Sequence, residues 1–204
     1  MFSFSRYIKK NRRGLYIDIG AGSPKEYNYT NTLYSIGWKG FLVEPNPVLA
    51  NILANERPKD IIYKGAILNY TGEVVLSTKN IYGIDMESWV YSAHKCLITG
   101  NGGSYHDFTV RCTTFTKLIK KHPQFINANF LNIDVDGNEI EILSGIDFNI
   151  FHPSVIIIEH RKREIDYHKI WSNIMEKKYN LAGQTSSTYY YTIKEGQGNE
   201  ISQN

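Results

Sequence analysis

The residues best suited to chemistry are acidic side chains that stand where apolar runs end. Three of them, Asp134, Asp136 and Glu139, follow the apolar run at 129–133. Crowded carboxylates repel one another, so such a group needs a positive partner, for example an ammonium, a sulfonium or a divalent ion. Mg²⁺ is a divalent ion that suits a few carboxylate ligands. The alternative role for Asp136 and Glu139 is to cap the next helix, whose N-terminus favours negative charge.

A second acidic residue with a neighbouring histidine closes the most continuous apolar run of the chain. This run spans 153–158 and is followed by Glu159 and His160. A neutral hydroxyl is a poor nucleophile, and histidine is the usual base near neutral pH, so His160 beside Asp134 suits activation of a hydroxyl. His94 and His106 remain rival bases in an irregular segment at 79–108. The predicted catalytic residues are Asp134, Asp136 and His160, and the predicted metal ligands are Asp134, Asp136 and Glu159.

A glycine-rich turn near the N-terminus predicts a nucleotide-type cofactor. Asp18 lies in an apolar run that ends at Gly20-Ala-Gly22, where the backbone can turn sharply and approach a ligand. Glu44 follows 22 residues after Gly22 and ends the next predicted strand, where a carboxylate can bind a ribose diol. The predicted cofactor contacts in these two segments are Asp18, Gly20, Ala21, Gly22, Glu44, Pro45 and Asn46.

Two cofactors fit this turn, NAD and S-adenosylmethionine. A dinucleotide site has a third glycine that lets the pyrophosphate approach a helix, but Lys25 stands at that position. Asp18 and Asp134 suit a cationic cofactor end, such as an α-amino group. We therefore expect S-adenosylmethionine.

The elements that must position these residues alternate between strand and helix. We expect a helix that starts at Ser23, with Glu26 completing a capping box, and ends before Gly37. Alternation of this kind predicts an α/β fold with a doubly wound, mostly parallel sheet and helices on both faces. Further strands are expected at 15–19, 41–44, 61–68, 74–78 (as an exposed edge), 108–113, 129–134, 153–160 and within 179–193, and further helices at 46–56, 116–122, 138–143 and 166–178.

The bulk properties agree with one globular domain over residues 1–204. The chain is 42% hydrophobic and 21% charged, with a net charge of +3 and two cysteines outside any CxxC spacing. No apolar stretch reaches the length of about 18 residues that a membrane span needs, so we expect a soluble cytoplasmic protein. Residues 1–13 form a basic lead-in, and 195–204 are expected to be a disordered tail.

Four ordered motifs within residues 15–160 resemble the FkbM-type methyltransferases. They are Tyr16-Ile-Asp-Ile-Gly-Ala-Gly, Gly37-Trp-Lys-Gly-Phe-Leu-Val-Glu-Pro-Asn-Pro47, Ile133-Asp-Val-Asp-Gly-Asn-Glu139 with Ile142-Leu-Ser-Gly145, and Pro153-x-x-Ile-Ile-Ile-Glu159. The resemblance implies a class I, Rossmann-like S-adenosylmethionine-dependent fold and O-methylation of sugars or natural products. It also implies that Asp18, Gly20 and Gly22 line the methionine, Glu44 holds the ribose, and Ala66 and Ile67 flank the adenine.

Three functions stay open from the sequence. The first is an O-methyltransferase, with or without a divalent metal, that acts on a sugar, glycan or small-molecule hydroxyl. The second is a nucleic-acid methyltransferase whose basic residues at 6–13 and 161–163 would bind the phosphate backbone. The third is a cofactor-binding module without catalysis. The segments 79–108 and after 165 are where acceptor choice is expected.

Overall fold

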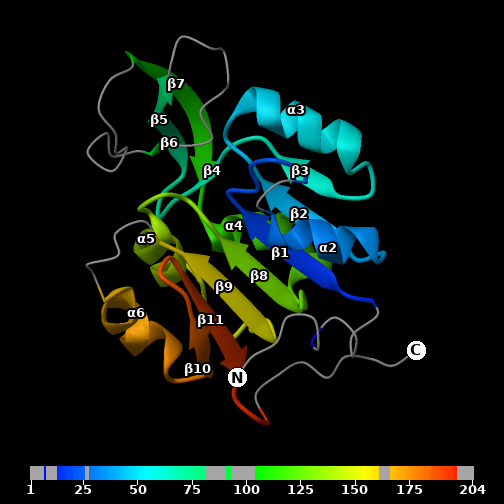
Figure 1. Ribbon diagram of the computed structural model, residues 1–204, viewed down its shortest axis with the longest axis vertical. Coiled ribbons are helices and arrows are strands. Elements are labelled where there is room, and N and C mark those ends of the chain that lie inside the picture. The colour runs from blue at the N-terminus through cyan, green and yellow to red at the C-terminus, as the bar shows by residue number, and fades with distance from the viewer. Residues whose placement is uncertain are drawn as a thin grey trace.

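A computed structural model describes residue 7 and residues 13–25, 28–80, 91–92, 104–160 and 166–196, with the backbone alone at 78–80, 91–92 and 104–106. Seven strands form the main sheet (Figure 1). They are β1 (Leu15–Ile19), β2 (Lys39–Val43), β3 (Ile61–Tyr63), β8 (Phe130–Ile133), β9 (Val155–Glu159), β10 (Tyr179–Gln184) and β11 (Thr188–Ile193).

The order of strands in this sheet is β10-β11-β9-β8-β1-β2-β3. Strands β3, β2, β1, β8 and β9 are parallel neighbours, and β11 runs antiparallel to both β9 and β10. The order reverses between β1 and β8, and ligands of open α/β sheets bind at such a reversal, outside the carboxyl ends of the strands. The predicted doubly wound, mostly parallel sheet is confirmed, with β9 buried between β8 and β11.

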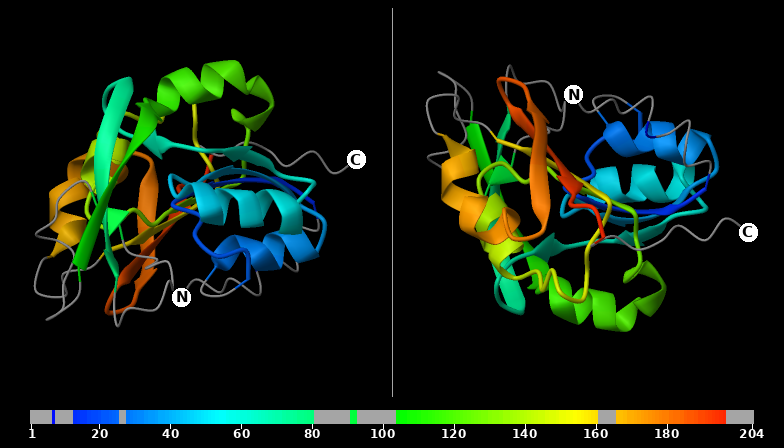
Figure 2. Two further views of the ribbon diagram at one scale, coloured as in Figure 1. Left: turned by 90° about the horizontal axis from the view of Figure 1, so that it is seen from above. Right: turned by 90° about the horizontal axis from the view of Figure 1, so that it is seen from below.

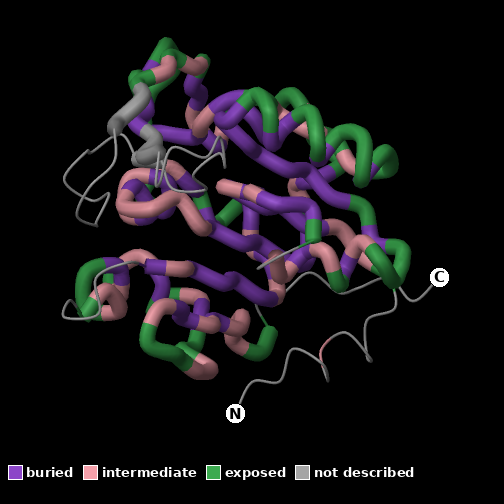
Figure 3. The backbone as a smooth tube through the Cα atoms, turned by 45° about the horizontal axis from the view of Figure 1, so that its top comes forward, coloured by how far each residue is buried: buried purple, intermediate pink, exposed green. Residues whose placement is uncertain are grey.

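Helices cover both faces of the main sheet, and each face has its own core. On one face α2 (Tyr29–Ser35) and α3 (Pro47–Glu56) bury Leu33 and Leu53 against Leu42 and Ile157. The other face is covered by α4 (Phe115–Lys121), α5 (Glu139–Ser144) and α6 (Tyr167–Met175). Figure 2 shows α4 on one side of the sheet and α2 with α3 on the other. The inner strands β1, β2, β8 and β9 are buried along most of their length, while the helices turn exposed residues outward (Figure 3).

The strand predicted at 61–68 is wrong as one element, because it divides between two sheets. After β3 the chain passes Gly65, whose N–H donates to the Glu44 carbonyl at 3.2 Å, and enters the short strand β4 (Ala66–Ile67). A Cβ at Gly65 would lie 2.6 Å from the Arg111 carbonyl oxygen, so the chain needs glycine where it crosses. Ala66 and Ile67 then pair with β7 (Ser104–Thr113) rather than with β2.

The second sheet has the order β4-β7-β5-β6 and projects beyond the main sheet (Figure 1). Its long ladder joins β5 (Gly72–Asn80) to β7 from the pair Gly72 and Cys112 to the pair Asn80 and Ser104. The two-residue strand β6 (Tyr91–Ser92) pairs with the far side of β5. Within the described ranges β6 covers β5 only at Ser77 and Thr78, so the predicted exposed edge holds for 74–76, where Val75 is exposed, and not for 77–78. Strands also enter the segment predicted to be irregular.

The first helix starts later than the predicted capping box. Asn28 is its N-cap, and its side-chain oxygen accepts from the Asn31 N–H at 2.9 Å. Ser23 instead accepts from the Lys25 N–H at 3.3 Å, within the loop that follows the glycine turn. Glu26 lies outside the described residues. The delay leaves residues 20–25 as a loop at the carboxyl end of β1.

The ends of the chain are only partly covered by the described residues. Of the basic lead-in, Tyr7 and Arg13 are described, and of the predicted tail only Glu195 and Gly196. No helix in the described ranges is long and apolar enough to cross a membrane.

Candidate active site

The glycine turn after β1 lies against the ends of both neighbouring strands. The N–H groups of Gly20 and Ala21 both donate to the Val43 carbonyl of β2, at 3.0 and 3.1 Å. Gly20 has φ +83°, and a Cβ there would lie 1.7 Å from the Asp134 carbonyl oxygen. Only glycine allows this contact, so the turn brings the ends of β1, β2 and β8 together.

Glu44 ties the end of β2 to this turn. Its carboxylate is fully buried, and its oxygens accept from the Gly22 N–H at 2.7 Å and from the Asn46 N–H at 2.8 Å. Asn46 in turn caps α3 by accepting from the Val48 N–H at 2.9 Å, and Pro45 links the two residues. Each carboxylate oxygen can accept two hydrogen bonds, so these contacts are compatible with the predicted ribose role.

Asp18 lies beneath the turn, within the layer between the sheet and α2. It is 1% exposed, and it accepts from Thr30 Oγ1 at 2.6 Å and from Asn132 Nδ2 at 2.9 Å. Burial raises the pKa of Asp18, and the bonds from Thr30 and Asn132 counter part of that rise. The structure therefore places Asp18 in a buried polar network rather than on an open wall of the site.

Arg57 extends this network and had no signal in the sequence. It is 1% exposed, donates to Thr30 Oγ1 at 2.9 Å, and also donates to the Pro24 carbonyl oxygen. Asn28, half-buried at the start of α2, donates to the Ala21 carbonyl at 2.7 Å. An arginine after a helix ordinarily indicates a solvated end, so only the fold shows that Arg57 is internal.

Four acidic side chains gather around the carboxyl ends of β8 and β9, and we call them the carboxylate cluster. Burial raises the pKa of Asp134 well above its usual range, and the charges of Glu159 and Asp136 raise it further. Asp136 has φ +56°, an uncommon conformation for a residue with a side chain. The members of the cluster are Asp134, Asp136, Glu139 and Glu159.

Glu139 is the most enclosed member of the cluster. It is 3% exposed at the start of α5, and its Oε1 accepts from the Gly137 N–H at 2.9 Å. Burial raises the pKa of this carboxyl from 4.5 to about 7 despite the backbone hydrogen bonds that lower it. Asn138 is the N-cap of α5 and makes no side-chain cap bond, so Glu139 adds negative charge to the first turn, and its bond to Gly137 lies before the helix rather than capping the helix N–H groups.

The sheet separates His160 from the carboxylate cluster. Along β9, Val155 and Ile157 face α2 and α3, while Ile156 and Ile158 face the helices on the other side. By this alternation Glu159 faces the side of α2 and α3, and His160 faces the opposite side. The His160 ring packs 4.8 Å from the Tyr167 ring and 5.0 Å from the Tyr189 ring, measured between centroids, and the residue is 4% exposed. Sequence reasoning put His160 beside Asp134, but the alternation of side chains along β9 turns it toward α6.

The side chains of the two rival bases, His94 and His106, are not among the described parts of the chain. His94 is outside the described residues, and for His106, in β7, only the backbone is described. Ala66 is half-buried against the core of the second sheet, and Ile67 is buried in the core that faces α4 to α6. Their predicted contact with adenine stays a prediction.

The predicted magnesium ligands do not form a recognisable metal site. Within the described ranges, no group of three or more carboxylate, imidazole or thiol side chains has an arrangement that could hold a metal ion. The prediction that Asp134, Asp136 and Glu159 bind Mg²⁺ therefore finds no support in this part of the chain.

Residues 18–181 match the family model described as the methyltransferase FkbM domain. The chain belongs to this family. It is an S-adenosylmethionine-dependent methyltransferase, and the predicted fold, enzyme class and organic cofactor are confirmed at that level. No curated protein matches the chain.

Several solved structures are similar to the chain at low identity. A TehB-like SAM-dependent methyltransferase from Corynebacterium glutamicum is 10% identical, with a TM-score of 0.47 over 95% of this chain and 89% of that one. M. capricolum TrmK in complex with S-adenosyl-homocysteine is 11% identical, with a TM-score of 0.47 over 100% and 72%. The Methanococcus jannaschii fibrillarin pre-rRNA processing protein is 13% identical, with a TM-score of 0.47 over 91% and 68%.

The residues present fit S-adenosylmethionine. A Cβ at Gly22 would meet no described atom within 4 Å, so the backbone of the turn is open there to a ligand. The carboxylate cluster is destabilised by its own charges, which is the environment that a cationic ligand relieves. S-adenosylmethionine carries a sulfonium and an ammonium, and both are cationic groups of the kind that this cluster favours.

Proposed function

We propose that this methyltransferase transfers a methyl group to a hydroxyl of a sugar, a glycan or another small neutral acceptor. The observation that carries the proposal is the carboxylate cluster at the ends of β8 and β9. A hydroxyl needs a proton acceptor to become a competent nucleophile, and a carboxylate within hydrogen-bonding reach of the acceptor can take that role.

The proposed roles divide the cluster between the donor and the acceptor. Bound S-adenosylmethionine supplies an electrophilic methyl group on a sulfonium. Asp134, at the strand reversal and next to Gly20, would pair with the cationic part of the donor. Glu159 lies on the same face of the sheet as Asp134. It would take the proton of the acceptor hydroxyl while the hydroxyl oxygen bonds to the methyl carbon. The carbon–sulfur bond breaks with its electron pair on sulfur, so the products are a methyl ether, S-adenosylhomocysteine and a protonated carboxyl.

The same charges argue against a nucleic-acid acceptor. A phosphate backbone brought to Asp134 and Glu159 would meet like charge at the reacting centre. The basic stretch at 161–163 lies outside the described residues, and of the stretch at 6–13 only Tyr7 and Arg13 are described. The nucleic-acid reading therefore rests on the sequence alone. Since the chain is an S-adenosylmethionine-dependent enzyme, the reading as a non-catalytic module is not carried forward.

The test is transfer of label from methyl-labelled S-adenosylmethionine to two sets of acceptors, mono- and oligosaccharides on one side and RNA on the other. We expect incorporation into a sugar, as a methyl ether that survives alkali and gives an O-methyl signal by NMR. Label in RNA, falling steeply with added salt, would refute the proposal. Transfer that persists in EDTA would separate the proposed carboxylate mechanism from a metal-assisted one.

A substitution assigns the role of the proton acceptor. Glu159→Gln keeps the size of the side chain, and we expect it to reduce kcat at least about 100-fold. The affinity for S-adenosylhomocysteine, measured by calorimetry, should stay close to that of the wild type. Glu56→Gln is the matched control, because Glu56 is an exposed carboxylate at the end of α3. A Glu159→Gln enzyme with normal kcat would remove Glu159 from the reaction.

A further inference from the structure

We infer that His160 is a positioning residue for methyl transfer, and that it acts through the neighbouring Glu159. The His160 ring is held in an aromatic clamp formed by Tyr167 and Tyr189. This clamp fixes the end of β9 so that the Glu159 carboxylate faces Asp134. The inference rests on the proposed function, because it assigns the proton to Glu159.

The first support is how firmly His160 is held. The backbone N–H of His160 donates to the Ser187 carbonyl at 2.8 Å. This bond joins the end of β9 to the turn before β11. The ring of His160 makes interplanar angles of 36° with Tyr167 and 34° with Tyr189. The backbone of His160 is thus held by the turn before β11, and its ring is held by α6 and β11.

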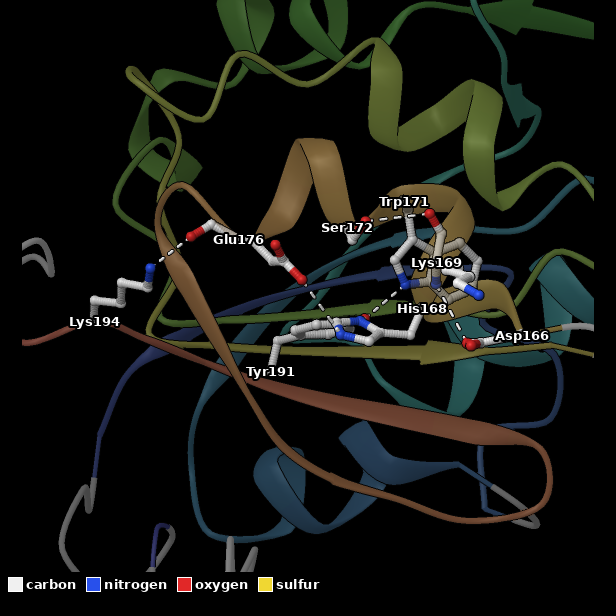
Figure 4. A network of polar contacts seen from close by, with 8 residues as sticks. All are labelled: Asp166, His168, Lys169, Trp171, Ser172, Glu176, Tyr191 and Lys194. Atoms are coloured by element: carbon white, nitrogen blue, oxygen red, sulfur yellow. Dashed lines mark hydrogen bonds and ion pairs between the residues drawn. The ribbon is translucent and has the colours of Figure 1, made fainter.

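The second support is that the clamp itself is anchored. Tyr167 and Tyr189 both pack on Trp171, with ring centroids 5.3 and 5.6 Å away. Trp171 Nε1 donates to the Tyr191 hydroxyl at 2.7 Å, and that hydroxyl lies 2.8 Å from His168 Nδ1 (Figure 4). An indole N–H can only donate, so the Tyr191 hydroxyl accepts from Trp171 and can donate its own proton to His168 Nδ1.

This network continues to the far end of α6. His168 Nε2 lies 3.6 Å from the Glu176 carboxylate, and Lys194 donates to the Glu176 carbonyl at 2.6 Å (Figure 4). Helix α6 and strand β11 are therefore joined by aromatic packing near His160 and by polar contacts beyond it. A rigid support of this kind is what a catalytic carboxylate needs, because small errors in position are costly in methyl transfer.

The third support is that the His160 ring cannot reach an acceptor bound at the carboxylate cluster. It is 4% exposed and packs in the core that faces α4 to α6, while Glu159 follows the alternation toward the opposite face. A base must come within hydrogen-bonding distance of the proton that it removes. An acceptor held at the carboxylate cluster would have the sheet between itself and the His160 ring. Glu159 pairs in register with Thr188 of β11, so the clamp and the carboxylate share one strand pair.

The experiment compares a variant that keeps the ring with one that removes it. His160→Phe preserves an aromatic ring between the two tyrosines, and we expect kcat within about threefold of the wild type. His160→Ala removes the clamp, and we expect kcat to fall between about 10-fold and 100-fold, with the affinity for S-adenosylhomocysteine unchanged. Added imidazole should not restore the activity of His160→Ala.

Two results would overturn the inference. One is a loss of at least about 100-fold in His160→Phe with normal binding of S-adenosylhomocysteine, which is the magnitude expected when a base is removed. The other is rescue of His160→Ala by imidazole. If His160→Phe does not fold, His160→Tyr takes its place, because it also keeps a ring between the two tyrosines without an imidazole: near-normal kcat supports positioning, and a loss of at least about 100-fold contradicts it.

A structural readout makes the inference independent of the acceptor. Crystal structures of the two variants with S-adenosylhomocysteine should show the Glu159 carboxylate displaced from Asp134 in His160→Ala and in place in His160→Phe. An unmoved Glu159 in His160→Ala would refute the positioning role even if the acceptor class proved different. Normal activity in Glu159→Gln would remove Glu159 from the reaction and this inference with it, whereas label in RNA would refute the proposed function.

Discussion

The buried carboxyl of Glu139 makes a prediction whose size follows from its surroundings. Its folded-state pKa of about 7 lies above the ordinary value of 4.5 because the side chain is buried at the start of α5. The folded protein therefore holds this proton more tightly than the unfolded chain does. The contribution of Glu139 to the free energy of unfolding is complete below pH 4.5. It falls as the pH rises and is lost above pH 7. Since one pKa unit corresponds to about 1.4 kcal/mol, the complete loss is roughly 3 kcal/mol.

Glu139→Gln removes this ionisation and leaves an oxygen that can accept from Gly137. The variant should therefore gain on the wild type as the pH rises, and the gap between their free energies of unfolding should widen by roughly 2 kcal/mol from pH 5 to pH 8. Urea unfolding at several pH values, without S-adenosylmethionine, measures the gap. Asp134 also has a raised pKa, and the charge of Glu139 contributes to that rise, so its removal relieves Asp134 as well and widens the gap in the same direction.

The matched control is Glu73→Gln, because Glu73 is an exposed carboxylate on β5. Its unfolding free energy should run parallel to that of the wild type over the same pH range. Parallel curves for Glu139→Gln would refute the reasoning, since they would mean that Glu139 ionises as easily in the folded protein as in the unfolded chain.

Two further predictions concern the support beneath the site. Gly20→Ala should destabilise the protein by at least about 3 kcal/mol, because its Cβ would collide with the Asp134 carbonyl, whereas Gly37→Ala, also at positive φ but with no described atom within 4 Å, should cost only about 1 kcal/mol. Equal melting temperatures for the two variants would contradict the close approach. Arg57→Met should lower stability by about 3 to 5 kcal/mol and should lose much of that penalty when Asp18→Asn is added, because Asp18 is then no longer a buried charge without a cation. Additive losses in a double-mutant cycle would show that the two residues are independent.

Local patterns in the sequence were enough to place the main elements in order. Apolar runs bounded by glycine, proline or acidic residues predicted β1, β2, β8 and β9, and the acidic residues at their ends carry the predicted site. These features can be predicted from neighbouring residues, because the apolar run of a buried parallel strand and the turn that ends it together span only about ten residues. The four motifs added the family, which the match over residues 18–181 confirmed.

The tertiary structure decided which of those residues are enclosed and which way they face. Asp18 binds Asn132, 114 positions away, and Arg57 reaches Thr30 across 27 positions, so neither contact leaves a local pattern. The face taken by His160 depends on the register of β9 and on Tyr189, which reaches it only because β11 returns beside that strand. Burial and pairing are properties of contacts between distant segments. For that reason the sequence predicted the carboxyl-end site, while the fold alone separated the histidine from the carboxylates.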